Sequence, residues 1–260
     1  MTDLDLPAGP GGRSMSFVPA PGRAPFRTVL ARQVRMELVL TARRGEAVVL
    51  AMGVPLLVLL GAGLTRATNL PSGNRLGYVV PGVLALTVMS TAFTGQAITT
   101  GYERGYGVLK RLGASPLTRP GLLAAKTAAV SCLVIAQLLV LAVVGVLAGW
   151  RPDLTRLIPA LGVTILATAA YCGLALCIAS LLKPETTTAA ATLIYVVMLA
   201  AGGIMFAAPG GAFLLPLTAH AEALRDALTN GQDISGSAWL TLTAWAIAGV
   251  TAAARTFRWE

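Results

Sequence analysis

Residues 76–102 read LGYVVPGVLALTVMSTAFTGQAITTGY and contain no charged residue. A helix that crosses a bilayer needs about 20 predominantly apolar residues, because the hydrocarbon core offers no water to charges or to unpaired backbone groups. A helix of a soluble protein rarely needs so long an uncharged run. The stretch therefore predicts a helix that crosses a membrane.

Further uncharged runs lie on both sides of this stretch, and the whole composition agrees with them. Apolar residues make up 55% of the chain and charged residues only 12%, about half of what a soluble domain carries. We therefore expect an all-α, polytopic membrane protein. Its six predicted transmembrane helices cover residues 47–64, 77–100, 122–149, 157–182, 189–208 and 237–254.

The net charge of +9 follows the predicted topology. If the N-terminus is cytoplasmic, 15 of the 20 Lys and Arg residues lie on the cytoplasmic side. Those outside are Arg66, Arg75, Arg151, Arg156 and Arg225. Positive residues favour the cytoplasmic face of a membrane, so the basicity indicates orientation and not a nucleic-acid surface. We expect both termini in the cytoplasm and the chain in the plasma (cell inner) membrane.

The sequence lacks the residue clusters that a membrane enzyme or an ion-coupled transporter needs. Cys132, Cys172 and Cys177 all lie in predicted spans, where thiols usually pack as small apolar groups. The single histidine, His220, is expected as an interfacial polar residue outside the membrane, and Lys126 lies close enough to the inner interface to reach it. No Gly-Lys-Ser/Thr phosphate loop is present. We expect no cofactor and no enzyme activity in this chain, so uphill transport would need energy from another one.

The N-terminal part divides into two segments before the transmembrane domain of residues 46–260. Residues 1–24 are rich in Gly and Pro and are expected to form a disordered cytoplasmic tail. Residues 25–45 predict an amphipathic helix at the cytoplasmic interface, although Gln33 and Glu37 interrupt its apolar side. A simple flank of the first span is the alternative. The apolar positions are Phe26, Val29, Leu30 and Val34.

Two connections between the spans have their own patterns. Residues 101–120, GYERGYGVLKRLGASPLTRP, predict a short cytoplasmic helix between glycine hinges. Its Tyr106, Leu109 and Leu112 are expected on one side, beside Lys110 and Arg111. Residues 186–221 stay uncharged for longer than one span requires, and they predict a broken apolar element that returns part-way into the membrane. An ordinary external loop is the alternative.

Several of these segments together resemble a known family across nearly the whole chain after residue 25. GYVVPGVLA at residues 77–85 resembles the aromatic-x-x-Pro-Gly start of the second span in type-2 ABC exporter permeases, typified by the daunorubicin-resistance transporters. Residues 103–119 resemble that family's Gly-x-Leu, basic-Leu and Ser-Pro loop. Residues 215–225 resemble its external Pro-Leu-Thr and Glu-Ala-Leu-Arg segment. The family's usual Gly-Thr is replaced here by Gly107-Val108.

The resemblance implies the rest of the transporter. Two permease chains, identical or not, would form the pathway, and two separate ATPase subunits would bind ATP and Mg. The interfacial helix and the short helix would contact the ATPase, with Glu103 as an anchor; the alternative for Glu103 and Arg104 is a solvated charge pair. The implied ATPase-coupling residues are Glu103, Arg104, Tyr106, Leu109, Lys110, Arg111 and Leu112.

The substrate is indicated only weakly. Hydroxyl, amide and phenol groups in the spans could line a pathway, although each of them could equally bond within or between helices. The spans hold few aromatic residues, which favours an amphipathic drug or lipid-like cargo, as in multidrug efflux and antibiotic resistance. The alternatives are export of a cell-envelope glycolipid or polysaccharide precursor, or a membrane anchor without transport. The candidate pathway residues are Thr91, Thr94, Gln96, Tyr171 and Tyr195.

Overall fold

The computed structural model describes residues 25–43, 45–64, 74–115, 117–204 and 212–257. Within these residues every regular element is helical, which confirms the all-α prediction. In this described part of the chain, five helices are long and apolar enough to cross a membrane. The first predicted span corresponds to α2 (Gly45–Leu64), of which the part Met52–Gly61 meets the criterion of a shorter apolar helix. The number of six spans therefore stays a prediction.

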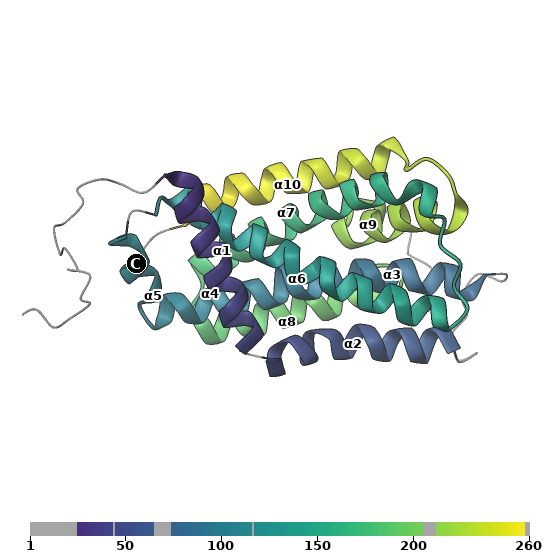
Figure 1. The fold of residues 1–260 in the computed structure, drawn as a ribbon, viewed down its shortest axis with the longest axis horizontal. Coiled ribbons are helices and arrows are strands. Elements are labelled where there is room, and N and C mark those ends of the chain that lie inside the picture. Colours follow the sequence, from purple (N-terminus) through teal and green to yellow (C-terminus); the bar gives the residue numbers. More distant parts are fainter. Residues whose placement is uncertain (1–24, 44, 65–73, 116, 205–211, 258–260) are drawn as a thin grey trace, which may run out of the picture.

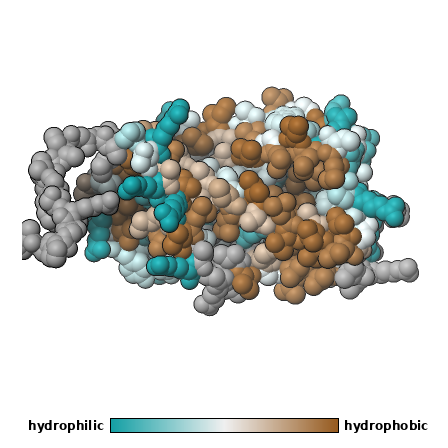
Figure 2. Space-filling model, in the orientation of Figure 1, coloured by the Kyte–Doolittle hydropathy of each residue, from teal (hydrophilic) through white to brown (hydrophobic). Residues whose placement is uncertain are grey.

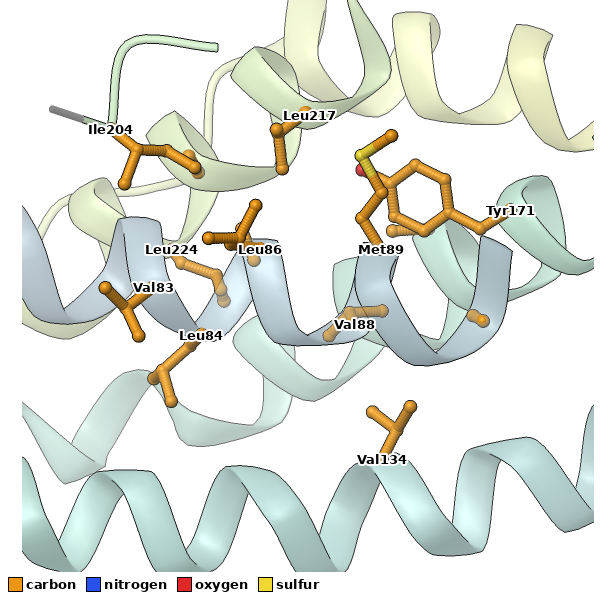
Figure 3. Packing of buried hydrophobic residues seen from close by; sticks show 14 of the residues in the cluster. Val83, Leu84, Leu86, Val88, Met89, Val134, Tyr171, Ile204, Leu217 and Leu224 are labelled. Atoms are coloured by element: carbon orange, nitrogen blue, oxygen red, sulfur yellow. The ribbon is translucent and has the colours of Figure 1, made fainter. Parts of the chain in front are cut away.

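The centre of the bundle is one long rod made of α3 (Arg75–Met89), a π-helical turn η1 (Ser90–Gly95) and α4 (Gln96–Gly105). In the most apolar stretch of this rod, 89% is buried inside the molecule. In the most apolar stretch of α6 (Arg119–Leu147), only 28% is buried. Figure 3 shows side chains of α3 pointing to several neighbours, with Met89 beside Tyr171 and Leu84 on another side of the helix. The rod is therefore enclosed by the other helices.

Helices α7 (Leu157–Leu181) and α8 (Pro184–Ala201) pack against this rod (Figure 1). Helix α10 (Gly236–Thr256) packs against α7 and α9. The backbones of α7 and α10 approach so closely that a Cβ added at Gly173 would lie 2.4 Å from the carbonyl carbon of Gly249. Small residues permit such contacts between membrane helices, where close packing replaces the hydrophobic effect.

Helix α1 (Phe26–Arg43) differs in direction from the others and lies across them in Figure 1. It shares one end of the molecule with the short helix α5 (Val108–Gly113), and we call this the α5 end. Hydrophilic side chains gather towards the two ends in Figure 2, and hydrophobic ones cover the middle. This distribution agrees with helices that are surrounded by lipid along their length and by water at their ends.

At the opposite end, α9 (Pro216–Arg225) packs against α3, α7 and α10 with nearly all of its residues buried. Arg225 donates from Nε to the Tyr78 carbonyl at 3.1 Å and from Nη2 to the Gly203 carbonyl at 2.7 Å. Its guanidinium lies 3.8 Å from the centre of the Tyr78 ring, and a Cβ at Gly82 would come within 2.9 Å of Nη2. The motif around Tyr78 and the motif around Arg225 are far apart in the sequence but contact each other here. The alternative of an ordinary external loop therefore does not fit α9. Pro209, Gly210 and Gly211 lie outside the described residues.

The expectation for His220 was wrong. The imidazole is 0% exposed, with Nε2 3.3 Å from the Thr164 hydroxyl of α7 and the ring beside that of Tyr171. Because α9 turns this side chain into the bundle, His220 is a core residue and not an interfacial one. The described residues contain no group of His, Cys, Asp and Glu that could hold a metal ion.

Candidate functional site

A buried ion cluster joins three helices near the α5 end. The Nζ of Lys126 on α6 lies 2.7 Å from Oε2 of Glu103 on α4 and 3.1 Å from Oε1 of Glu37 on α1. Only 1% of the Lys126 side chain is exposed, so the expectation that it reaches the interface was wrong. Removing one member of a buried ion pair leaves the partner's charge without compensation. Lys126 therefore links α6 both to α1 and to α4, and we call this group of three charges the Lys126 cluster.

Arg104 fixes the same end of α4 to another helix. Its Nη1 donates to the carbonyl oxygens of Ser180 at 2.6 Å and Ala179 at 3.2 Å, both in the last turn of α7. A cation is favourable at a helix C-terminus, where unpaired carbonyls concentrate negative partial charge. Glu103 and Arg104 thus contact different helices, and a solvated charge pair does not describe them.

The short helix α5 begins after a turn at Tyr106 and Gly107, whose φ of 71° is a conformation that glycine adopts readily. Leu109 is 1% exposed and packs with Leu117, Leu122 and Phe257. This small cluster pins α5 to the start of α6 and the end of α10.

The expected shared face of Tyr106, Leu109 and Leu112 is wrong for Tyr106, whereas Leu109 and Leu112 pack in the same cluster. Leu109 faces the chain's own interior and Leu112 packs at the edge of its cluster. Tyr106 precedes the helix and is 74% exposed, stacked on Tyr102 with ring centroids 5.9 Å apart. The coupling residues left open to a partner are Tyr106, Lys110 and Arg111.

Only some of the predicted interfacial residues lie on the side of α1 that faces the bundle. Val29, Leu30 and Val34 are half-buried, whereas Phe26 is exposed. Val29 also packs against the Leu109 cluster, so α1 and α5 share a contact. Glu37, which interrupts the apolar pattern in the sequence, is the residue that ties α1 to Lys126.

A polar cavity of about 90 Å³ lies beside the Lys126 cluster, between α1, the η1–α4 segment and α6. Two of the five predicted pathway residues, Thr91 and Gln96, line it. The Thr91 hydroxyl donates to Oε1 of Gln137 on α6 at 2.7 Å. Gln137 had no role in the sequence predictions, although an amide in the middle of an apolar span was a signal for it.

The other pathway candidates do not join this cavity. Thr94 belongs to the π-helical turn, and its hydroxyl is buried with no hydrogen-bond partner among the described residues. Tyr171 lies beside His220, and Tyr195 is part of the main hydrophobic core. The five residues therefore do not form one continuous site within the described chain.

Two comparisons with known proteins bear on this arrangement. A family model described as ABC-2 type transporter matches residues 26–221, from the first residue of α1 into α9. The matched range includes the Lys126 cluster, α5 and the polar cavity. No curated protein matches the chain.

Proposed function

We infer the function of this chain from the premise that it belongs to the ABC-2 type transporter family. It is a multi-pass membrane permease of an ABC exporter. Beyond this, we propose that it pairs with a second permease chain in the plasma membrane, with both termini in the cytoplasm. Separate ATPase subunits bind ATP and Mg and drive the export of an amphipathic drug or lipid-like molecule, and this chain contributes no catalytic site.

The observation that carries the proposal is the Lys126 cluster. It connects the transverse helix α1, the end of α4 and α6 at one place, and only two residues separate α4 from α5. A displacement of α1 or α5 by a partner would therefore reach two long helices directly. Packed helices that shift as rigid bodies are a common means of switching between conformations.

The exposed residues beside this cluster supply the contact surface for the ATPase. Tyr106, Lys110 and Arg111 project from the turn and from α5, while Leu109 anchors that segment internally. Tyrosine and arginine, here Tyr106 and Arg111, are enriched among the residues that dominate protein interfaces. Glu103 and Arg104 act behind this surface as positioning residues.

The polar cavity favours a transporter over a membrane anchor without transport. An anchor has no need of a hollow lined by Thr91, Gln96 and Gln137 within an apolar bundle. The lipid-like cargo is preferred over a polysaccharide precursor because the predicted spans hold few aromatic residues.

Co-purification tests the proposal. The tagged full chain, extracted in mild detergent from its own membranes, should bring down a P-loop ATPase, and the pair should hydrolyse ATP. A Tyr106→Ala, Arg111→Glu chain should recover less of it, and Leu154→Asp at the opposite end serves as the control. Absence of any ATPase in the complex, or ATP turnover by the permease alone, would contradict the proposal.

A further inference from the structure

We propose that the polar cavity between α1, η1 and α6 binds the compact, uncharged, hydroxyl-bearing head of an amphipathic molecule. Gln137 is its specificity-determining residue. The inference rests on the proposed function, because the bound molecule would be the exported cargo. It goes further by assigning a chemical class to the head and a place where it binds.

Gln137 offers an unused donor to this cavity. Its side chain is 3% exposed and its Oε1 accepts from Thr91, but its Nε2 has no hydrogen-bond partner among the described residues. Burying an amide N–H without a partner is unfavourable, so such groups are rare unless water or a ligand satisfies them. Gln137 lines the cavity, but its Nε2 is covered in this conformation, so the side chain must rotate for an acceptor in the cavity to reach it.

The backbone next to the cavity is also unusual. The π-helical turn Ser90–Gly95 interrupts the central rod here, and π-turns within α-helices occur frequently at functional sites. A Cβ added at Gly95 would meet no atom closer than the Ser90 carbonyl oxygen, at 3.6 Å. Packing therefore does not require glycine at this position. A larger side chain at Gly95, which lines the cavity, would instead fill it.

The shape of the cavity fits a small head with an apolar body. Its volume of about 90 Å³ holds a head of a few heavy atoms. Most of its accessible wall is apolar and includes Leu40, Val130 and Leu133, and all three side chains are at least partly exposed. An acyl chain or a similar body can extend past these residues while the head stays among the polar groups.

The charges of the wall select against an anionic head. The carboxylates of Glu37 and Glu103 outnumber the Lys126 ammonium between them, so the cluster carries an excess negative charge that repels an anion. A quaternary ammonium head has no lone pair to accept from the Gln137 amide. A hydroxyl accepts from that amide and donates to a carboxylate or threonine oxygen, so it satisfies both kinds of group at once.

Photolabelling of the full chain in phosphatidylcholine nanodiscs tests this site without ATP or a partner. The probe is a monoacylglycerol with a diazirine in its acyl chain, and labelled peptides are mapped by mass spectrometry. Saturable labelling near the cavity should be displaced by 1-monooleoylglycerol at about tenfold lower concentration than by oleate or oleyltrimethylammonium, the factor that one hydrogen bond supplies.

Two variants and a control complete the test. Gln137→Met removes the donor at similar volume and Gly95→Leu fills the cavity, so each should lower labelling about tenfold. Val143→Met, on an exposed part of α6, should not change it. Size-exclusion profiles verify folding, and if one variant misfolds, the other and the competitor series still decide.

Labelling that does not saturate, or that ignores both variants, would overturn the site and leave a cavity for water only. Such a failure would not touch ATPase recruitment, which is measured separately. Conversely, specific labelling without a recruited ATPase would retain the site and contradict the transport function.

Discussion

Glu103 and Lys126 are 23 positions apart in the chain, yet their carboxylate and ammonium groups meet at 2.7 Å and join α4 to α6. The next residue, Arg104, turns to the carbonyls that end α7. Two consecutive side chains thus fix the end of the central rod to two different helices. The turn that leads into α5 therefore starts from a rigid support.

The first prediction concerns the stability of this support. Lys126→Met leaves the carboxylates of Glu37 and Glu103 buried without their cation, which should cost about 3–5 kcal/mol of unfolding free energy. The measurement is denaturant unfolding in mixed micelles. Lys183→Met, an exposed lysine between α7 and α8, is the matched control and should stay within about 0.5 kcal/mol. Equal stability of the two variants would show that the cluster is not structural.

A second prediction tests the contact between α7 and α10. Gly173→Ala places a methyl 2.4 Å from the backbone of Gly249, so the helices must separate, at about 1–3 kcal/mol. At Gly53 on α2 an added Cβ meets nothing within 4 Å, and Gly53→Ala should be neutral or stabilising. Thermal unfolding of both variants gives the comparison. A destabilised Gly53→Ala beside an unchanged Gly173→Ala would contradict this packing.

The sequence predicted the helices well because residues in the membrane interior, whether they face lipid or other helices, are nearly all uncharged. Long uncharged runs located the five described helices that can span a membrane to within several residues. The central span was underestimated, since α4 continues to Gly105 and includes Glu103 and Arg104. Those charges lie in the helix because α6 supplies a partner for Glu103 and α7 supplies partners for Arg104, and such partners cannot be found from a local pattern.

The environment of single polar residues was the part that sequence reasoning missed. The local pattern presents His220 and Lys126 as isolated side chains and assigns no role to Gln137. All three are buried by contacts with other helices, namely Thr164 for His220, Glu103 for Lys126 and Thr91 for Gln137. Leu109 shows the same difficulty: its helical periodicity indicated an apolar side without saying what would cover it.

The third prediction concerns orientation in the membrane. Asp153 and Gln232 lie in connections at the end opposite α5, where the Asp153 amide donates to the Leu228 carbonyl. Single cysteines at these positions, in a chain without Cys132, Cys172 and Cys177, should react with an impermeant maleimide on intact cells. A cysteine at Ser115 should react only after permeabilisation. The reverse pattern would invert the topology. Asn69, expected outside as well, is not among the described residues.

The last prediction concerns coupling to the ATPase. Tyr106 is exposed and Leu109 is buried within the chain, so substitutions at the two positions should have different consequences. Tyr106→Ala should leave the fold intact and weaken the association with the ATPase by about 2 kcal/mol, roughly 30-fold in Kd. Leu109→Asp buries a charge among Leu117, Leu122 and Phe257, so it should destabilise the α5 end itself.

Binding of the purified ATPase to permease variants in nanodiscs, together with their melting temperatures, separates these effects. Tyr106→Ala should change the Kd and leave the melting temperature unchanged, whereas Leu109→Asp should lower both the affinity and the melting temperature. Leu154→Asp, exposed at the opposite end, is the control and should alter neither. If Tyr106→Ala binds the ATPase normally, the turn before α5 is not the contact, and the exposed arginines of α1 become the surface to test.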